Sequence, residues 1–360
     1  MSIPTNNLYN FVAQALENQY LVKYFYPWGE KAFQNIIDHS TDMIRGDSYQ
    51  DITDRSNPNV KDLRYRKIPV LMCHDQEPLD FDLYSDTNML EQLDSISQKQ
   101  DIEYFLKKDR KDLNLRWIHA EHEAEYWTLL HSEVNSAEVD KYNESGIFRC
   151  AYWWAHAPIA RDWYRFAQYD TRLKRQSQDI VANFLVYARG TTGKRAYRNL
   201  FLEQLKHIDS IQLGSINQQD VTSKTSAEYN AQDFAHTNCS VVLETVYDRI
   251  HLTEKILRPL ACGHPFIILN GAGALEKIRE YGFETFQPYI NESYDKEQNP
   301  TKRMDMVIHE MNRINKSSAK YQNWIWQGCN EIAEYNKRLF FDDKFIWRVK
   351  TELRRTVRTV

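Results

Sequence analysis

Short apolar runs recur along this chain, and each is followed by polar residues and then by a longer segment. Runs of this kind occupy residues 68–73 (IPVLMC), 128–130 (TLL), 184–188 (FLVYA), 240–244 (SVVLE) and 265–269 (PFIIL). Their length and composition predict buried strands. Strands that alternate with helical segments predict parallel βα units, in which ligand-binding residues collect at the carboxyl ends of the strands. We therefore predict an α/β fold.

Apolar residues that recur at helical spacing predict the helices. Leu8, Phe11, Val12 and Leu16 recur at this spacing within residues 8–26 and predict an opening helix. The same pattern predicts the later helices over residues 152–169, 195–208, 253–262, 304–311 and 321–340.

The chain length predicts more than one domain. A single hydrophobic core rarely keeps growing to 360 residues. A polar break, RLKRQSQ, begins at Arg172, and we place a boundary near Arg175. The predicted division is an N-terminal domain over residues 1–175, a second domain over 176–335, and a C-terminal helix over 336–360 that could pack back on the first domain.

Composition narrows the function classes. The formal net charge is -4, so contact with nucleic acid would need a local basic patch. No window of about 18 apolar residues and no secretory leader are apparent, and we expect a cytoplasmic chain with no membrane span. The five cysteines are scattered without a CxxC pair, which predicts free thiols. We expect no metal site.

The most informative stretch is residues 239–273, CSVVLETVYDRIHLTEKILRPLACGHPFIILNGAG. A buried strand brings Glu244 to its end, and Thr253 is placed to cap a helix whose first turn holds Glu254 and Lys255. A lysine there opposes the helix dipole unless an anion such as a diphosphate is shared with the backbone amides. Glu254 could accept hydrogen bonds from ribose hydroxyls. The alternative is an ordinary solvated first turn.

This stretch resembles the donor-binding segment of α-1,3-fucosyltransferases, whose pattern is Phe-Glu-Asn, then Thr-Glu-Lys, then Ala-Gly-x-x-Pro. The matching residues are 243–245 (LET), 253–255 (TEK) and 261–265 (ACGHP). The phosphate-binding arginine of that family lies in a helix written Arg-x-x-Phe-x-x-x-Leu, which RNLFLEQL from Arg198 to Leu205 reproduces. Thr245 replaces the asparagine of the pattern, which leaves the sugar and the base of the donor open.

The resemblance implies the GT-B architecture, in which two Rossmann-like domains face each other across a cleft. It implies a nucleotide-diphosphate sugar as co-substrate, with no other cofactor. An arginine and a lysine on one diphosphate would stabilise the departing nucleotide. We expect substitution of Arg198 or Lys255 to open no cavity in the core. The expected donor-binding residues are Arg189, Arg195, Arg198, Glu244, Thr253, Glu254 and Lys255, with Arg195 as the competitor of Arg198.

Over most of its length the chain resembles phage-encoded glycosyltransferases. The resemblance lies in residues 73–79 (CHDQEPL), 129–136 (LLHSEVNS), 156–167 (HAPIARDWYRFA) and 251–267 (HLTEKILRPLACGHPFI). Some such enzymes decorate 5-hydroxymethylcytosine or a related base in phage DNA, and others act on surface glycans.

Our preferred expectation for the acceptor is a hydroxymethylated or hydroxylated cytosine in double-stranded phage DNA, in the host cytoplasm. The basic clusters at residues 172–175 and 348–358 could contact phosphates. One alternative is transfer to a surface polysaccharide or another glycan. Another is a non-catalytic protein that binds glycans or nucleic acid on a transferase scaffold.

The N-terminal domain should supply a general base that takes the proton of the acceptor hydroxyl. Asp75 and Glu77 follow the predicted strand over residues 68–73, and His74 lies beside them. We expect Asp75 or Glu77 to be the base, and we place His131 and Glu133 behind them. The alternative for each of these residues is a helix cap or a solvated turn.

Overall fold

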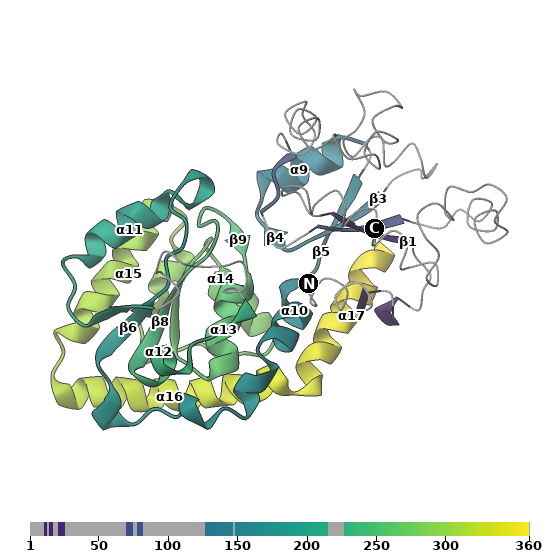
Figure 1. Ribbon diagram of the computed structural model, residues 1–360. Coiled ribbons are helices and arrows are strands. Elements are labelled where there is room, and N and C mark those ends of the chain that lie inside the picture. The colour runs from purple at the N-terminus through teal and green to yellow at the C-terminus, as the bar shows by residue number, and fades with distance from the viewer. Residues whose placement is uncertain are drawn as a thin grey trace, which may run out of the picture. The chain divides into compact units, whose positions relative to one another are not determined.

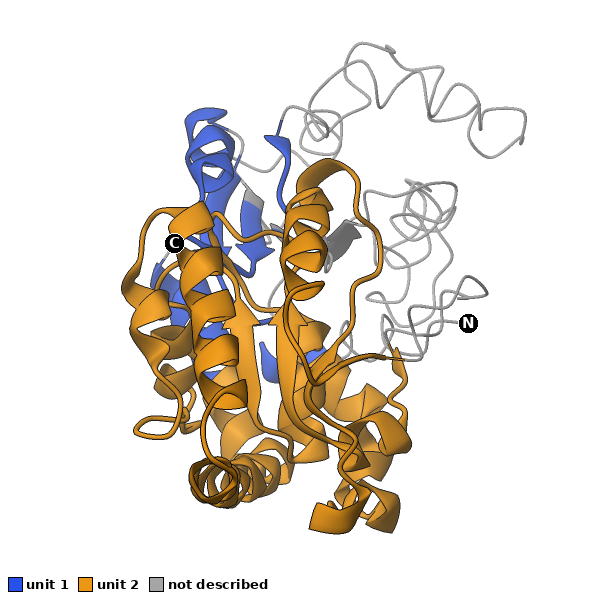
Figure 2. Ribbon diagram, turned by 90° about the vertical axis from the view of Figure 1, so that its left-hand side faces the viewer, with its two compact units in different colours: residues 1–155, 350–360 blue, residues 156–349 orange. Residues whose placement is uncertain are grey.

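The structure, a computed structural model, forms two compact units. One comprises residues 1–155 with 350–360, and the other comprises residues 156–349 (Figure 2). The chain passes from the first to the second unit at His156, earlier than Arg175, where we placed the boundary. The residues that the structure describes are 11–12, 14–16, 21–25, 70–74, 78–81, 127–146, 148–214 and 227–359.

The first unit contains a parallel sheet of four strands in the order β1-β2-β3-β5. Helix α9 (Ala137–Glu144) contacts β5. The strands predicted over residues 68–73 and 128–130 are confirmed as β2 and β3. The strand bounds are β1 Leu21–Phe25, β2 Val70–His74, β3 Trp127–His131 and β5 Phe148–Tyr152.

The predicted opening helix is wrong from residue 21 onward. Helical structure is present among residues 11–15, but residues 21–25 form strand β1. Leu21 pairs with Val70 and Phe25 with His74 in a parallel ladder. Valine, tyrosine and phenylalanine favour strands, and pairing with a neighbouring strand overrides a helical spacing of apolar residues.

The second unit contains a parallel sheet in the order β10-β8-β6-β7. All four residues of β10 are buried, as are all but one of β8, which fits the central position of β8 and a sheet covered on both faces. The strands predicted over 184–188, 240–244 and 265–269 are confirmed with small shifts. The bounds are β6 Ala182–Val186, β7 Ile211–Leu213, β8 Thr237–Leu243 and β10 Phe266–Leu269.

Strand order in this sheet reverses between β6 and β8. The chain runs from β6 through α11 (Tyr197–Leu205) to β7 on one side, and from β8 through α13 (Glu254–Cys262) to β10 on the other. Right-handed crossovers in opposite directions place their helices on opposite faces of a sheet. Figure 1 shows α11 and α13 on the two sides of β6 and β8.

Most predicted helices of the second unit are confirmed, but the one predicted over 152–169 is interrupted. Its first residue, Tyr152, belongs to β5, α10 covers His156–Trp163, and a 3-10 turn follows at Arg165–Gln168. In the part of the chain that the structure describes, no helix has the length and apolar character needed to cross a membrane. The other helices are α12 Ala231–Ala235, α14 Ala274–Glu280, α15 Pro300–Asn315, α16 Ala319–Phe341 and α17 Asp343–Thr359.

The core of the second unit depends on large side chains of the sheet. Phe184 on β6 is fully buried, and its ring centroid lies 6.1 Å from that of Trp326 on α16. Phe184→Ala should lower the free energy of unfolding by about 3–5 kcal/mol, because it removes a buried ring and leaves a cavity. Phe166 is 66% exposed, and Phe166→Ala should change the free energy of unfolding by less than about 0.5 kcal/mol. Equal effects of the two changes in urea unfolding would contradict this packing.

Candidate functional site

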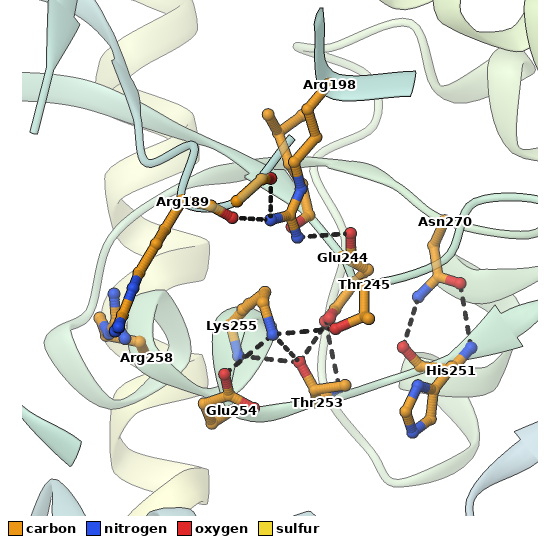
Figure 3. Close-up of polar contacts among 12 residues, drawn as sticks. Arg189, Arg198, Glu244, Thr245, His251, Thr253, Glu254, Lys255, Arg258 and Asn270 are labelled. Carbon is orange, nitrogen blue, oxygen red and sulfur yellow. Dashed lines mark hydrogen bonds and ion pairs between the residues drawn. The ribbon is translucent and has the colours of Figure 1, made fainter. Parts of the chain in front are cut away.

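Six of the seven donor-binding residues predicted from the sequence, all except Arg195, appear together in Figure 3, where the strand order reverses. Arg189 and Gly190 follow β6, whereas Glu244 and Thr245 follow the adjacent strand β8. From β8 the chain continues through β9 (Ile250–His251) to the beginning of α13. The carboxyl ends of parallel strands at such a reversal are where open α/β sheets bind ligands.

Glu244 connects the end of β8 to the beginning of α13. Its side chain is fully buried and accepts hydrogen bonds from Thr253 N at 3.1 Å and from Thr253 Oγ1 at 2.5 Å. Burial raises the pKa of the Glu244 carboxyl, although the charge of Lys255 and the two bonds from Thr253 oppose the rise. Glu244 is thus positioned to orient Thr253 and is closed off from solvent.

Thr253 caps α13, as the sequence predicts. Its Oγ1 accepts a hydrogen bond from Lys255 N at 3.3 Å while donating to Glu244. A threonine cap satisfies one of the free amides of the first turn. The cap and the buried carboxylate together set where α13 begins.

Lys255 extends its ammonium group back over the beginning of α13. Nζ lies 2.9 Å from Glu254 Oε1 and 3.2 Å from both Thr245 Oγ1 and Thr253 Oγ1. The side chain is 26% exposed. The ion pair with Glu254 compensates the unfavourable position of a lysine in a first helical turn. Of the three contacts, only the one to Glu254 is to a charged group.

Glu254 is ionised in this environment. Burial raises the pKa of its carboxyl, but the charges of Lys255, His156 and Arg258 outweigh that effect and lower the pKa to about 2. The residue is only 6% exposed. A negative charge therefore lies under the ammonium group of Lys255.

Arg198 is buried and joins the ends of β6 and β8. Its Nη1 donates to the carbonyls of Arg189 and Gly190, and its Nη2 donates to those of Leu243 and Glu244 at 2.9 and 2.8 Å. Among the described residues its Nε has no hydrogen-bond partner.

The burial of Arg198 overturns one expectation from the sequence. Arg198 is 2% exposed and is one of the largest fully buried side chains. Its replacement by alanine would remove one donor from each of four carbonyls and would open a cavity, so we expect it to destabilise the fold. The motif RNLFLEQL describes the inner face of α11, because Arg198, Phe201 and Leu205 are all buried.

The two other predicted arginines lie on the polar segment after β6. Arg189 is exposed, and Figure 3 shows its side chain extending away from that of Arg198. Arg195 is half-buried in a 3-10 turn, Gly193–Arg195. The carbonyl of Arg189 accepts a hydrogen bond from Nη1 of Arg198.

Sequence reasoning missed two groups beside this site. Asn270, at the end of β10, accepts from His251 N at 3.0 Å and donates to His251 O at 3.1 Å, which ties the last strand end to the segment before α13. Arg258 is buried on α13 and donates to Tyr164 Oη at 3.3 Å. The spacing of four residues between Glu254 and Arg258 could have indicated the second group.

The predicted general bases belong to the first unit. His74 is the last residue of β2, and the structure describes only its backbone, whereas Asp75 and Glu77 lie outside the described residues. Glu133 is buried, and its carboxylate accepts from Leu79 N at 2.7 Å and from Ser136 Oγ at 2.5 Å. Glu133 thus joins Leu79, in the segment after β2, to the segment after β3. The identity of the base stays a prediction.

Comparison of the chain with protein-family models, with curated proteins and with solved structures found no match. Within the described ranges, no group of three or more His, Cys, Asp and Glu side chains could hold a metal ion.

The cap of α13 gives a stability prediction. Thr253→Ala removes the cap and one of the donors to Glu244, and we expect it to lower the free energy of unfolding by about 1–2 kcal/mol. Thr253→Ser keeps the hydroxyl and should lower the free energy of unfolding by much less. Urea unfolding of the three proteins measures the difference. An alanine variant as stable as the wild type would show that the hydroxyl does not hold the helix.

The lowered pKa of Glu254 gives a pH prediction. A carboxyl whose pKa falls from 4.5 to about 2 on folding stabilises the fold above pH 4.5, and this contribution is lost as the pH falls towards 2. The wild type should therefore be more stable than Glu254→Gln at pH 7, and the difference should shrink between pH 4.5 and 2. Unfolding curves across this range test it, and a difference that does not depend on pH would contradict the assignment.

Proposed function

We propose that the second unit binds the diphosphate of a nucleotide sugar at the carboxyl ends of β6 and β8, and that the protein transfers the sugar to a hydroxyl acceptor. One observation carries the proposal. The ammonium group of Lys255, whose side chain is 26% exposed, is fixed over the beginning of α13, at the reversal of strand order. At this position a parallel α/β sheet offers a ligand the amides at the beginning of a helix and the crevice at the reversal of strand order.

The electrostatics of this position favour an anion with several oxygens. The amino end of a helix carries a partial positive charge, and the ammonium of Lys255 adds a full one. Two of the three contacts of Nζ are to threonine hydroxyls at 3.2 Å. Phosphate oxygens carry charge and form stronger bonds to an ammonium group than hydroxyls do. A diphosphate would therefore replace the hydroxyl contacts and leave the ion pair with Glu254 in place.

Arg198 acts in this proposal as a positioning residue. Its four bonds to carbonyls hold the segments after β6 and β8 at a fixed separation. Tyr197 Oη also donates to the carbonyl of Glu244. Segments that are already ordered lose less entropy when a ligand binds, so this framework favours affinity.

The proposed chemistry needs charge stabilisation at the donor and proton removal at the acceptor. As the bond to the sugar breaks, negative charge grows on the departing diphosphate, and Lys255 with the α13 amides would stabilise it. A carboxylate of the first unit, Asp75 or Glu77 with His74 beside it, would take the proton of the acceptor hydroxyl. We propose the GT-B arrangement for the two units. The acceptor of preference is modified cytosine in DNA, with a glycan as the alternative.

Donor binding can be tested at Lys255. Lys255→Ala should weaken binding of a nucleoside diphosphate by about 10- to 100-fold, the range expected for one hydrogen bond to a charged group. Lys206→Ala is the matched control, because Lys206 forms an exposed ion pair with Glu203 on α11, away from the strand ends. Isothermal titration with a panel of nucleoside diphosphates measures the affinities.

Equal affinity of the Lys255→Ala variant and the wild type for every nucleotide bound would reject the site. Turnover is a separate measurement, in which release of nucleoside diphosphate from a nucleotide sugar is followed with acceptor present. Binding at Lys255 without any release would reject the transferase proposal and support a non-catalytic binding protein.

A further inference from the structure

The last helix, α17, has two contrasting faces. It is the yellow helix that leads to the C-terminus in Figure 1. Its apolar face consists of Phe345, Val349, Leu353 and Val357, all buried in the fold. Its opposite face is exposed and basic, and it includes Trp347, which is 65% exposed. Burial of the apolar face accounts for the packing of α17.

The charge of α17 differs from that of the rest of the chain. The helix, DKFIWRVKTELRRTVRT, carries six lysines and arginines against two carboxylates, a net charge of +4. The whole chain carries -4, so the remaining residues carry -8. A concentration of positive charge in an otherwise acidic chain is typical of a surface that contacts a polyanion.

Four of these cations form one stripe, which we call the α17 stripe: Lys344, Arg348, Arg355 and Arg358. At about 100° per residue they fall within a sector of about 80° on the helix. All four are exposed, and within the described part of the chain none of them forms an ion pair.

The two remaining cations of α17 have contacts within the fold. Lys350 lies over the ring of Phe11, with Nζ 5.2 Å from the centroid, and Arg354 Nε donates to Ala15 O at 2.7 Å. Lys350 and Arg354 thus take part in packing, whereas the other four cations are exposed, with the guanidinium group of Arg348 lying against Gly282.

We propose that the α17 stripe binds the phosphate backbone of duplex DNA. From Lys344 to Arg358 the stripe spans about 21 Å at 1.5 Å per residue. Duplex DNA carries one negative charge per about 1.7 Å of its axis, so several phosphates lie within reach of a straight stripe of this length. Arginine side chains are well suited to grip phosphate oxygens in pairs.

Other polyanions fit the α17 stripe less well. A helix that binds a membrane surface buries its apolar face among the lipids, but Phe345, Val349 and Leu353 are already buried in the protein. A single-stranded nucleic acid is usually held on a series of stacked aromatic side chains, and on this face of α17 Trp347 is the one aromatic residue.

The choice of DNA over a glycan as the acceptor rests on the proposed function. Binding of DNA by the α17 stripe does not depend on that function. DNA binding can be measured on the full chain without any nucleotide sugar, so failure of the donor site and failure of the α17 stripe give different results. Lys255→Ala should lose nucleotide affinity and keep DNA affinity.

The test is the salt dependence of binding to a labelled 20-base-pair duplex. With four phosphates contacted, the affinity of the wild type should fall about 100-fold between 50 and 200 mM salt. Arg348→Gln combined with Arg355→Gln removes two contacts, so the affinity of this variant should fall only about 10-fold and should be lower at 50 mM. Glutamine keeps the helix, because it is a good helix former.

The control variant combines Lys302→Gln with Lys320→Gln. Both lysines are exposed in the first turns of α15 and α16, and the change in net charge is the same. It should bind the duplex as the wild type does. The proposal is overturned if the wild type does not bind the duplex, if both variants lose affinity equally, if neither does, or if vesicles of anionic lipid bind more tightly than the duplex.

Discussion

The two hydrogen bonds between the buried carboxylate of Glu244 and Thr253 determine the geometry of the candidate site. Removing a carboxylate from water costs several kcal/mol, and only well-placed donors offset that cost. Here the donors are the backbone and the side chain of the residue that caps α13. The end of β8 and the beginning of α13 therefore cannot move independently, and Lys255 is held relative to both.

Arg198 provides the corresponding link between the two strands. A buried guanidinium group that donates to four carbonyls holds the chain after β6 against the chain after β8. These are the two strands between which the order of the sheet reverses. Arg198, which the resemblance assigned to the phosphate, is thus buried between the strand ends, whereas the side chain of Lys255 is 26% exposed.

Local sequence patterns predict much of this structure. Continuous apolar runs predict β2, β3, β6, β8 and β10. Parallel strands that are buried on both faces have apolar residues at successive positions, so they can be recognised as short apolar runs. The threonine cap and the acidic first turn predict the beginning of α13. The local predictions fail where tertiary contacts determine the secondary structure. In β1, pairing with β2 overrides a helical spacing of apolar residues.

The relation between distant residues could be predicted only in part. Nothing local to Arg198 shows that its partners are carbonyls, since strand order decides which strand ends lie beside α11. The link between Asn270 and His251 depends in the same way on the adjacency of β10 and β8. A sequence motif predicts which side chains belong to the site. Only the fold shows which of them could contact a ligand and which hold the others in position.

The most direct measurement is a crystal structure of the protein with a bound nucleoside diphosphate. We expect phosphate oxygens within hydrogen-bond distance of Lys255 Nζ and of the first amides of α13, with Arg198 still bonded to its four carbonyls. A diphosphate bound elsewhere, with Lys255 Nζ still bonded to Thr245 and Thr253, would contradict the proposed site.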